Sequence, residues 1–527
     1  MDPIHLFELV IAMFLAIIVL HFAAHKLGLP PSVALLVGGA SLAFLPGLPA
    51  IALDPNLVLV IFLPPLLMDG AWFIALGRLR RHMIGIASLA VGAVVFTCVV
   101  VAVATHLVFP SLPWAACAAL GAIVSPPDAV SARAVLQRVK LPRRLQILLE
   151  GESLFNDASG LVLFRFAIAA GVTGTFSAVD AVGEFFLLAL GGVLVGVAAG
   201  ATWVLLARRL GDEYLIIAAT CLLSWSSYLL GEMLHVSGVI ATVTTGLIAG
   251  WYQHTVFSAS VRMRGTAFWT VMIFLMEAAV FILIGFTLRG VVERGGGFSV
   301  VADTMTAPIL VILAALTLAR FAWVFGSDLV IRLCRAAGLD RYTPLGLANA
   351  TILSWAGVRG VVTLALALSI PEGFPGRDFI LVTSFAVILG TVLVQGTTLG
   401  RVIGWVKPVE PESERARLTM AQAESAMAQK QLVTIEKLAY DSEGTLIHPR
   451  LLERYQRRAT MIVDYAERTE AYQPGLHAHF DVVLAAIATG RDELIRLHRL
   501  GKIDNETLHE LERDLDLEEL SAISAKS

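Results

Sequence analysis

Two aspartates, Asp128 and Asp157, lie within stretches of the chain that are otherwise apolar enough to cross a membrane. An ionised side chain near the centre of a bilayer costs about 2.5–3.5 kcal/mol on insertion scales, so such residues usually mark a functional site. The first follows a Ser-Pro-Pro sequence and the second follows an asparagine. Carboxylates in this setting predict a site that binds a cation and a proton.

The first aspartate ends a predicted helix break, Ser125-Pro126-Pro127-Asp128. Because proline has no N–H, carbonyl groups in the preceding turn lose their helical donors. Freed backbone at membrane depth is tolerated only where it faces protein or a water-filled cavity, and broken helices bind cations there. A simple proline kink is the alternative interpretation of this motif taken by itself.

The second aspartate belongs to a set of polar side chains at helical spacing. Glu152 precedes Asn156 by four residues, and Ser153 precedes Asp157 by four, so the two pairs form neighbouring stripes on one helix. Ser153 and Asp157 can therefore offer oxygens to one small cation such as Na⁺, together with Asp128. We expect Asn156 to hydrogen-bond with the facing break.

Burial disfavours the ionised form of a carboxyl group. We therefore expect Asp157 to hold either a proton or a cation, and competition for one carboxylate is enough to couple two ion fluxes. This hypothesis predicts that Asp157→Asn abolishes exchange without unfolding the protein.

A second interruption falls at Gly357-Val358-Arg359-Gly360, inside an apolar run in the second half of the chain. Two glycines around a charged residue indicate unwound backbone, and inverted repeats would place a second broken helix here. The alternative is a glycine-rich packing site whose arginine extends toward the membrane surface.

The composition excludes an ordinary soluble globule. The chain has 527 residues, of which 57% are hydrophobic and 15% charged, and its mean hydropathy is +0.78, whereas soluble domains carry roughly 25% charged residues. The net charge of −3 gives no indication of a nucleic-acid partner. No cofactor is expected, and membrane lipid is the expected surrounding.

Apolar runs long enough to cross a bilayer predict about thirteen spans. They lie near residues 4–23, 31–47, 56–75, 83–108, 114–137, 145–170, 180–207, 213–231, 237–252, 266–288, 303–331, 344–369 and 378–405. Alternate loops, beginning with the first, carry sixteen Lys and Arg residues, and the opposite set carries three. Because cytoplasmic loops collect Lys and Arg, the N-terminus is expected outside and the C-terminal region in the cytoplasm.

The chain changes character near residue 408. Residues 408–527 are polar and contain no run long enough to span a membrane, but several segments have amphipathic helical periodicity. We expect two domains: a transmembrane domain at 1–407 and a cytoplasmic helical domain at 408–527.

Residues 4–405 resemble the monovalent cation:proton antiporter family, and more narrowly the bacterial and eukaryotic Na⁺/H⁺ exchangers with an Asn-Asp pair. The motifs that carry the resemblance are SPPDAV, GESLFNDASG, LPPLLMD at 63–69, HVSGVIATVTTGLIAG, WAGVRG at 355–360 and TVLVQGTTL at 391–399. They occur in the family's order.

The resemblance implies an all-α polytopic membrane protein with about thirteen transmembrane helices, plus a cytoplasmic helical tail. Two inverted-topology repeats of six helices would follow the first span, and two broken helices would cross near the site. It also implies a homodimer in the cell membrane that exchanges Na⁺ for H⁺ electroneutrally, with a mobile core domain sliding against a dimerisation domain.

The same resemblance assigns roles to residues. Asp157 would be the ion-binding carboxylate and Asn156 its partner, with Asp128 and Ser153 as further ligands of the transported Na⁺. Glu152 would form a salt bridge with Arg320 of the eleventh helix, and Arg359 would balance charge at the second break. The supporting residues are therefore expected to be Glu152, Arg320, Arg359, Ser125 and Asp69, the last near the access path or at the end of the third helix.

Other charged residues in the apolar region are expected to be structural. Arg165 and Glu277 could pair with each other or with other polar groups, and Glu232 is expected to be solvated at an external turn.

Three alternative functions remain open at this point. A K⁺/H⁺ antiporter would differ only in cavity size and ligand placement. An intramembrane aspartyl protease would use the two aspartates, although the chain has no GxGD motif. An ion channel would need a repeated selectivity-filter loop, which the sequence does not display.

Overall fold

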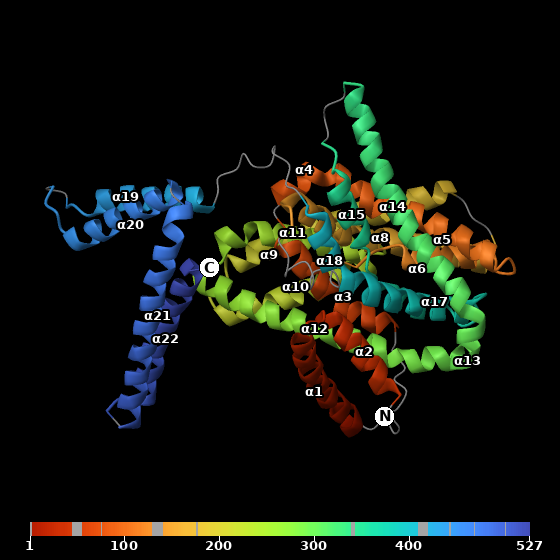
Figure 1. The fold of residues 1–527 in the computed structure, drawn as a ribbon, viewed down its shortest axis with the longest axis horizontal. Coiled ribbons are helices and arrows are strands. Elements are labelled where there is room, and N and C mark those ends of the chain that lie inside the picture. Colours follow the sequence, from red (N-terminus) through yellow and green to blue (C-terminus); the bar gives the residue numbers. More distant parts are fainter. Residues whose placement is uncertain are drawn as a thin grey trace. The chain divides into compact units, whose positions relative to one another are not determined.

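The computed structural model describes residues 3–44, 55–74, 76–128, 141–174, 178–338, 343–408, 420–441, 444–467, 469–500 and 502–526. The regular secondary structure in these ranges is helical, with one isolated β-bridge between Tyr440 and Leu446. Two compact units are present, Met1–Glu410 and Pro411–Ser527. Figure 1 shows the helices of both units.

The helices of the first unit follow the predicted spans closely. They are α1 (Pro3–Leu27), α2 (Pro31–Ala43), α3 (Pro55–Trp72), α4 (Leu76–Ala87), η1 (Ser88–Ala93), α5 (Val94–Val108), α6 (Trp114–Val124), α8 (Arg143–Thr173), α9 (Ala178–Ala207), α10 (Glu213–Met233), α11 (Gly238–Val256), α12 (Ala259–Arg294), α13 (Phe298–Val300), η2 (Val301–Met305), α14 (Thr306–Ala336), α15 (Leu347–Trp355), α16 (Val361–Leu368), α17 (Arg377–Gly390), η3 (Thr391–Gly396) and α18 (Thr397–Val406). The η segments are π-helical turns that continue the neighbouring α-helices. The predicted spans 31–47 and 114–137 extend into residues 45–47 and 129–137, which lie outside the described residues.

Seven helical stretches of the described residues are long and apolar enough to cross a membrane. They are Leu79–Val108, Arg143–Thr173, Val182–Ala207, Glu213–Met233, Ala259–Arg294, Phe298–Ala336 and Arg377–Val406. Shorter apolar helices cover Ile11–Leu27, Pro31–Ala43, Leu59–Trp72 and Trp114–Val124. The all-helical membrane fold is therefore confirmed, and the total of thirteen crossings stays a prediction.

The helices of the first unit pack in two groups, which meet along one boundary. The scaffold group contains α1–α3 and α9–α12, in which α2 packs along α12 and α11 packs along α9 and α3. The site group contains α4–α6, α8 and α13–α18 with the η segments, in which α6 packs against α5 and α8, and α14 packs against α5 and α15. In Figure 1, α5, α6, α8 and α14 are gathered on one side of the unit. The site group contains both predicted breaks.

Small residues allow α2 and α12 of the scaffold group to pack closely. A Cβ placed on Gly39 of α2 would lie 2.5 Å from the Ile282 carbonyl oxygen of α12, and one on Gly285 would lie 2.4 Å from the Ala40 nitrogen. Lipid tails are as apolar as leucine, so helices in a membrane associate through such close packing rather than through a hydrophobic driving force.

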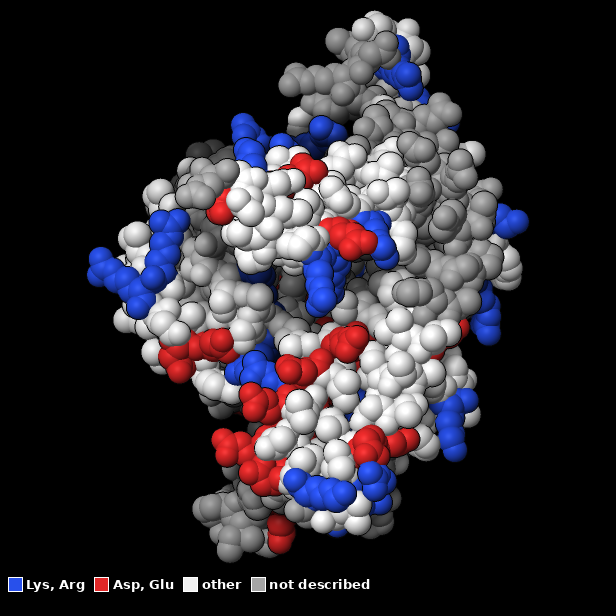
Figure 2. Space-filling model, turned by 90° about the vertical axis from the view of Figure 1, so that its left-hand side faces the viewer, with Lys and Arg blue, Asp and Glu red and all other residues white. Residues whose placement is uncertain are grey.

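The second unit is also helical, as its amphipathic pattern predicted. It contains α19 (Met420–Leu438), α20 (Pro449–Glu467), α21 (Thr469–Arg499) and α22 (Asn505–Lys526). α19 packs with α20, and α21 packs with α22. Arg491 joins the second pair through Asp516 and Glu519, at 2.5 and 2.7 Å. In the view of Figure 2, the acidic and basic side chains of the described residues are interspersed.

Candidate ion-exchange site

At the first break, several carbonyl groups accept hydrogen bonds from specific side chains. α6 ends at Val124, and the chain then runs through Ser125 to Asp128 without helical structure. The Ser125 hydroxyl donates to the Ala122 carbonyl at 3.3 Å. Asn156 Nδ2 of α8 donates to the Pro127 carbonyl at 2.6 Å. The Ser-Pro-Pro-Asp sequence is therefore an ordered break in which the Ala122 and Pro127 carbonyls are hydrogen-bonded, rather than a simple kink.

The second break lies between α15 and α16, where residues 356–360 are not helical. The backbone N–H of Asp128 donates to the Val358 carbonyl at 2.7 Å, so one hydrogen bond joins the two breaks. A Cβ on Gly360 would lie 1.7 Å from Asp128 Oδ2. Only glycine therefore leaves room for the Asp128 carboxylate in this arrangement.

Arg359 is the cation at this crossing, and its side chain is only 2% exposed. Its Nε donates to the Val124 carbonyl at 2.8 Å, and Nη2 donates to the Ser125 carbonyl at 3.1 Å; Nη1 also contacts the Gly357 carbonyl. The last carbonyls of a helix carry partial negative charge and lack internal donors, so Arg359 both satisfies and neutralises the end of α6. An arginine that extends toward the membrane surface is thus ruled out.

Three of the predicted ligands line one cavity at this crossing. Its lining consists of Asp128, Ser153 and Asp157, with Leu63, Leu66, Leu67, Gly70, Glu150, Leu154, Val361 and Val362. The walls come from α3 of the scaffold group and from α8, α16 and the first break of the site group. Three carboxylates, of Asp128, Glu150 and Asp157, and one hydroxyl thus line a cavity whose other walls are mainly apolar. The charges of Asp128 and Asp157 interact electrostatically.

Asn156 does not line this cavity, because it is fully buried on the adjacent stripe of α8. Its amide nitrogen holds the first break, and its Oδ1 has no hydrogen-bond partner among the described residues. The geometry therefore assigns Asn156 to positioning the break beside Asp157.

Glu152 and Arg320 form a buried ion pair behind the cavity. Arg320 Nη1 and Nη2 donate to Glu152 at 2.5 and 2.8 Å, and the two side chains are 4% and 2% exposed. Arg320 also donates to the Leu353 carbonyl from Nε and Nη2, at 3.2 and 3.0 Å. Since Leu353 belongs to the last turn of α15, this pair connects α8, α14 and the helix before the second break.

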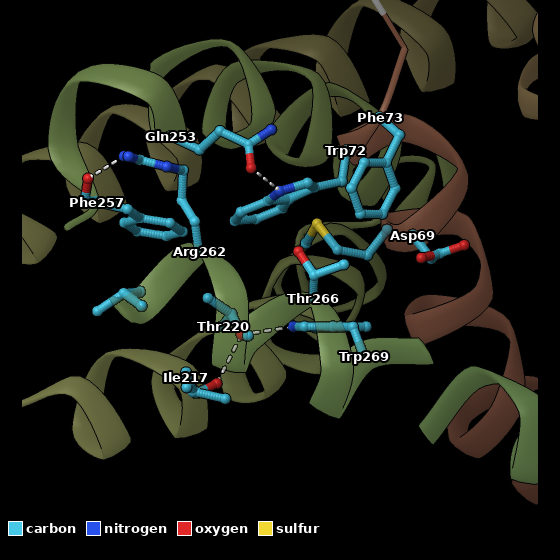
Figure 3. Close-up of a pocket in the computed structure, with 13 residues that line it drawn as sticks. Asp69, Trp72, Phe73, Ile217, Thr220, Gln253, Phe257, Arg262, Thr266 and Trp269 are labelled. Carbon is cyan, nitrogen blue, oxygen red and sulfur yellow. Dashed lines mark hydrogen bonds between the residues drawn. The ribbon is translucent and has the colours of Figure 1, made fainter. Parts of the chain in front are cut away.

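Two of the predicted supporting residues lie away from the cavity. Ser125 is 2% exposed, and it contributes its hydroxyl and carbonyl to the break. Asp69 lines a separate pocket between α3, α10, α11 and α12, which Figure 3 shows. There it lies at the edge, with its carboxylate turned away from the Trp72 ring.

Sequence reasoning missed two residues of the site. Thr391 Oγ1 accepts the backbone N–H of Arg359 at 3.1 Å, and only its polarity inside an apolar run could have indicated a role. Glu150 lines the cavity and precedes Ser153 by three residues and Asp157 by seven. That spacing places all three on one face of α8, so helical periodicity was a usable signal.

The expected solvation of Glu232 holds in part, because its side chain is 34% exposed, but the residue also forms an ion pair. Arg165 of α8 forms an ion pair with Glu232 of α10 at 3.3 Å. Glu232 Oε1 also accepts the backbone N–H of Gly238 at 3.4 Å. The pair thus joins the site group to the scaffold group.

Comparisons with known proteins agree with this fold. Residues 10–405 match the transmembrane family of sodium/hydrogen exchangers. An uncharacterized Na⁺/H⁺ exchanger of Escherichia coli, YjcE, is 31% identical over 495 residues, which cover 88% of this chain and 89% of that relative. The sodium, potassium, lithium and rubidium/H⁺ antiporter of Bacillus subtilis is 35% identical over 370 residues, which cover 66% of this chain and 54% of the relative.

The fold is also that of a solved structure. The sodium/proton antiporter MjNhaP1 of Methanocaldococcus jannaschii at pH 8 superposes with a TM-score of 0.59 and 20% identity, covering 75% of this chain and 98% of that one. The members of the sodium/hydrogen exchanger family are membrane-spanning cation/proton antiporters, and are therefore transporters rather than enzymes. The chain belongs to this family.

Proposed function

We propose that this protein exchanges Na⁺ for H⁺ by alternating access, with Asp157 as the carboxylate that both ions share. The observation that carries the proposal is the single cavity lined by Asp128, Ser153 and Asp157. Small hard cations prefer oxygen ligands, and these three residues offer carboxylate and hydroxyl oxygens. A proton on Asp157 removes the charge that the cation needs, so the two ions exclude each other.

Exchange of one cation for one proton is the stoichiometry we propose. One alternating carboxylate carries one positive charge in each direction, and the transport cycle then moves no net charge. Arg359 and the Glu152–Arg320 pair keep fixed partners in protein, so they need not change protonation during the cycle.

The orientation we propose follows from the basic loops and the cavity. On the α8 stripe, the cavity lining continues from Asp157 toward Ser153 and Glu150, in the direction of the N-terminal end of that helix. This end carries Arg143 and Arg144, which the Lys and Arg bias assigns to the cytoplasm. The cavity is then open to the cytoplasm in this state, with the N-terminus outside and residues 408–527 in the cytoplasm.

A homodimer in the cell membrane is part of the same proposal. α1 exposes Leu15, Ile18, Val19 and Phe22, and α9 exposes Leu187, Leu190 and Leu194. Such faces require lipid or a second protein surface. In the dimer, the scaffold group would provide the fixed contact while the site group moves.

K⁺/H⁺ exchange is the second candidate function. The observation that favours it is the name of the Bacillus subtilis relative, a sodium, potassium, lithium and rubidium/H⁺ antiporter. The same oxygen ligands would serve K⁺ if the cavity admitted a larger ion.

The test is dye-quench antiport in inverted membrane vesicles with Na⁺, Li⁺ or K⁺ over a range of pH. We expect Na⁺-driven proton movement for the wild type and none for Asp157→Asn, with normal amounts of folded protein. Asp303→Asn is the matched control, because Asp303 is an exposed aspartate of η2 outside the cavity. Continued exchange by Asp157→Asn would refute the shared-carboxylate mechanism, and a response to K⁺ alone would replace Na⁺ with K⁺.

A further inference from the structure

The Arg165–Glu232 pair lies where the two helix groups meet, beyond the ion site. Arg165 follows Asp157 by eight residues on α8, which is about 12 Å along the helix axis. It pairs at 3.3 Å with Glu232 in the last turn of α10. Tyr228, one turn earlier on α10 and 5% exposed, lies within electrostatic reach of both charges.

A packed apolar layer lies beside the cavity, where the two helix groups meet. It brings together Leu154 and Ala158 of α8, Leu63 and Leu67 of α3, Tyr228 of α10, and Val239, Ile240 and Val243 of α11, all of which are buried. The layer therefore joins side chains of the site group to side chains of the scaffold group. Leu63, Leu67 and Leu154 of this layer also line the cavity, whereas Ala158 lies between Asp157 and Arg165 along α8.

We propose that Arg165 and Glu232 form a latch that holds the outer side of the transporter closed in this state. The inference rests on the alternating-access function proposed above, since opening the outer side requires α8 to move relative to α10. That movement separates the two charges and opens the apolar layer, and closure brings the charges back together.

The latch has a modest effect on the balance between the two states. The side chains of Arg165 and Glu232 are 46% and 34% exposed, and exposed ion pairs shift an equilibrium by about 1.5- to fivefold. Breaking the pair should increase the outward-open population by that factor. A stronger latch would slow exchange, because every cycle must break it.

The latch can be tested by cysteine accessibility in the full-length chain. The native Cys98, Cys117, Cys221 and Cys334 are free thiols and would be replaced. Ala158→Cys then places a probe in the apolar layer, and right-side-out vesicles are treated with a membrane-impermeant maleimide. We expect Arg165→Gln to raise the labelling rate from outside about 1.5- to fivefold. Glu232→Gln should act alike, and it retains an oxygen that accepts the Gly238 N–H.

Swapping the charges of Arg165 and Glu232 distinguishes an effect of their ion pair from a local disturbance of packing by either substitution. The double variant Arg165→Glu/Glu232→Arg restores an ion pair with reversed sign, so its labelling rate should return toward that of the parent. Arg289→Gln is the matched control, because Arg289 pairs with Glu293 at 2.8 Å within α12 alone and joins no two groups. We expect it to leave labelling unchanged.

Two results would overturn the latch: an unchanged labelling rate for Arg165→Gln, or a charge-reversed double variant that labels faster than either single variant. Dye-quench exchange measured for the same variants keeps the two proposals distinguishable. Asp157-dependent exchange without any effect of Arg165→Gln on labelling would remove the latch and leave the proposed function in place. Absent exchange in the parent protein would instead count against the proposed function.

Discussion

Removing Arg320 should destabilise the protein more than removing both Arg320 and Glu152. The two side chains form a bidentate pair at 2.5 and 2.8 Å and are almost fully buried. Breaking a buried pair by deleting one partner costs about 3–5 kcal/mol, because an uncompensated charge remains inside, whereas replacing both partners with apolar residues is often neutral.

The Leu353 carbonyl modifies this expectation. It accepts from Arg320 Nε and Nη2 and lies in the last turn of α15, where helical donors are missing. Any variant without Arg320 leaves this buried acceptor unsatisfied, at a cost of about 1–3 kcal/mol. Arg320→Met therefore incurs both costs, and Glu152→Met/Arg320→Met incurs only the second.

The assay is the fraction of monodisperse protein that survives heating in detergent, measured as an apparent melting temperature. We expect the wild type to be the most stable, the double variant to be intermediate and Arg320→Met to be the least stable. Glu293→Gln serves as the control, since its pair with Arg289 is exposed and lies within one helix, and such pairs contribute only about 0.3–0.5 kcal/mol. A double variant no more stable than Arg320→Met would refute this reasoning.

Two further predictions concern the contact between the breaks. Gly360→Ala should displace the Asp128 carboxylate, because the added Cβ would lie 1.7 Å from Oδ2. We expect a raised apparent KM for the cation in vesicles. Gly404→Ala is the control and should leave this KM unchanged, because a Cβ on Gly404 has no other atom within 4 Å. Thr391→Val should leave the backbone N–H of Arg359 without its acceptor. We expect the free energy of unfolding to fall by about 1–3 kcal/mol, which would appear as a lower apparent melting temperature. Thr391→Ser should preserve the stability, and equal losses in the Val and Ser variants would contradict the role of the hydroxyl.

The sequence predicted the helices and their interruptions well. Apolar length locates a span because each backbone group must be satisfied within the membrane. The Ser-Pro-Pro-Asp and Gly-Val-Arg-Gly sequences predicted breaks because proline and glycine act on the backbone next to them. The three- and four-residue spacing on α8 likewise placed Ser153 and Asp157 on one face, and both line the cavity.

Assignments that depended on partners far along the chain were less secure. Arg165 was a candidate partner of Glu277, but the structure pairs it with Glu232. Asp69 was expected near the access path or at the end of the third helix; it lies in the last turn of α3 and lines a pocket separate from the cavity. In both cases the residue type indicated a polar contact, and nothing in the neighbouring sequence selected its partner.

The sequence by itself thus determined where the chain is helical, where it breaks and which face of α8 is polar, since these depend on residues within one or two turns. Only the tertiary structure decided which carbonyls accept hydrogen bonds from Arg359 and Asn156. Arg359 donates to the Val124 carbonyl, 235 residues away in the sequence, and Asn156 donates to the Pro127 carbonyl, 29 residues away. The physical reason is that these hydrogen bonds are fixed by how helices pack against one another, and packing depends on the shapes of all the surfaces in contact.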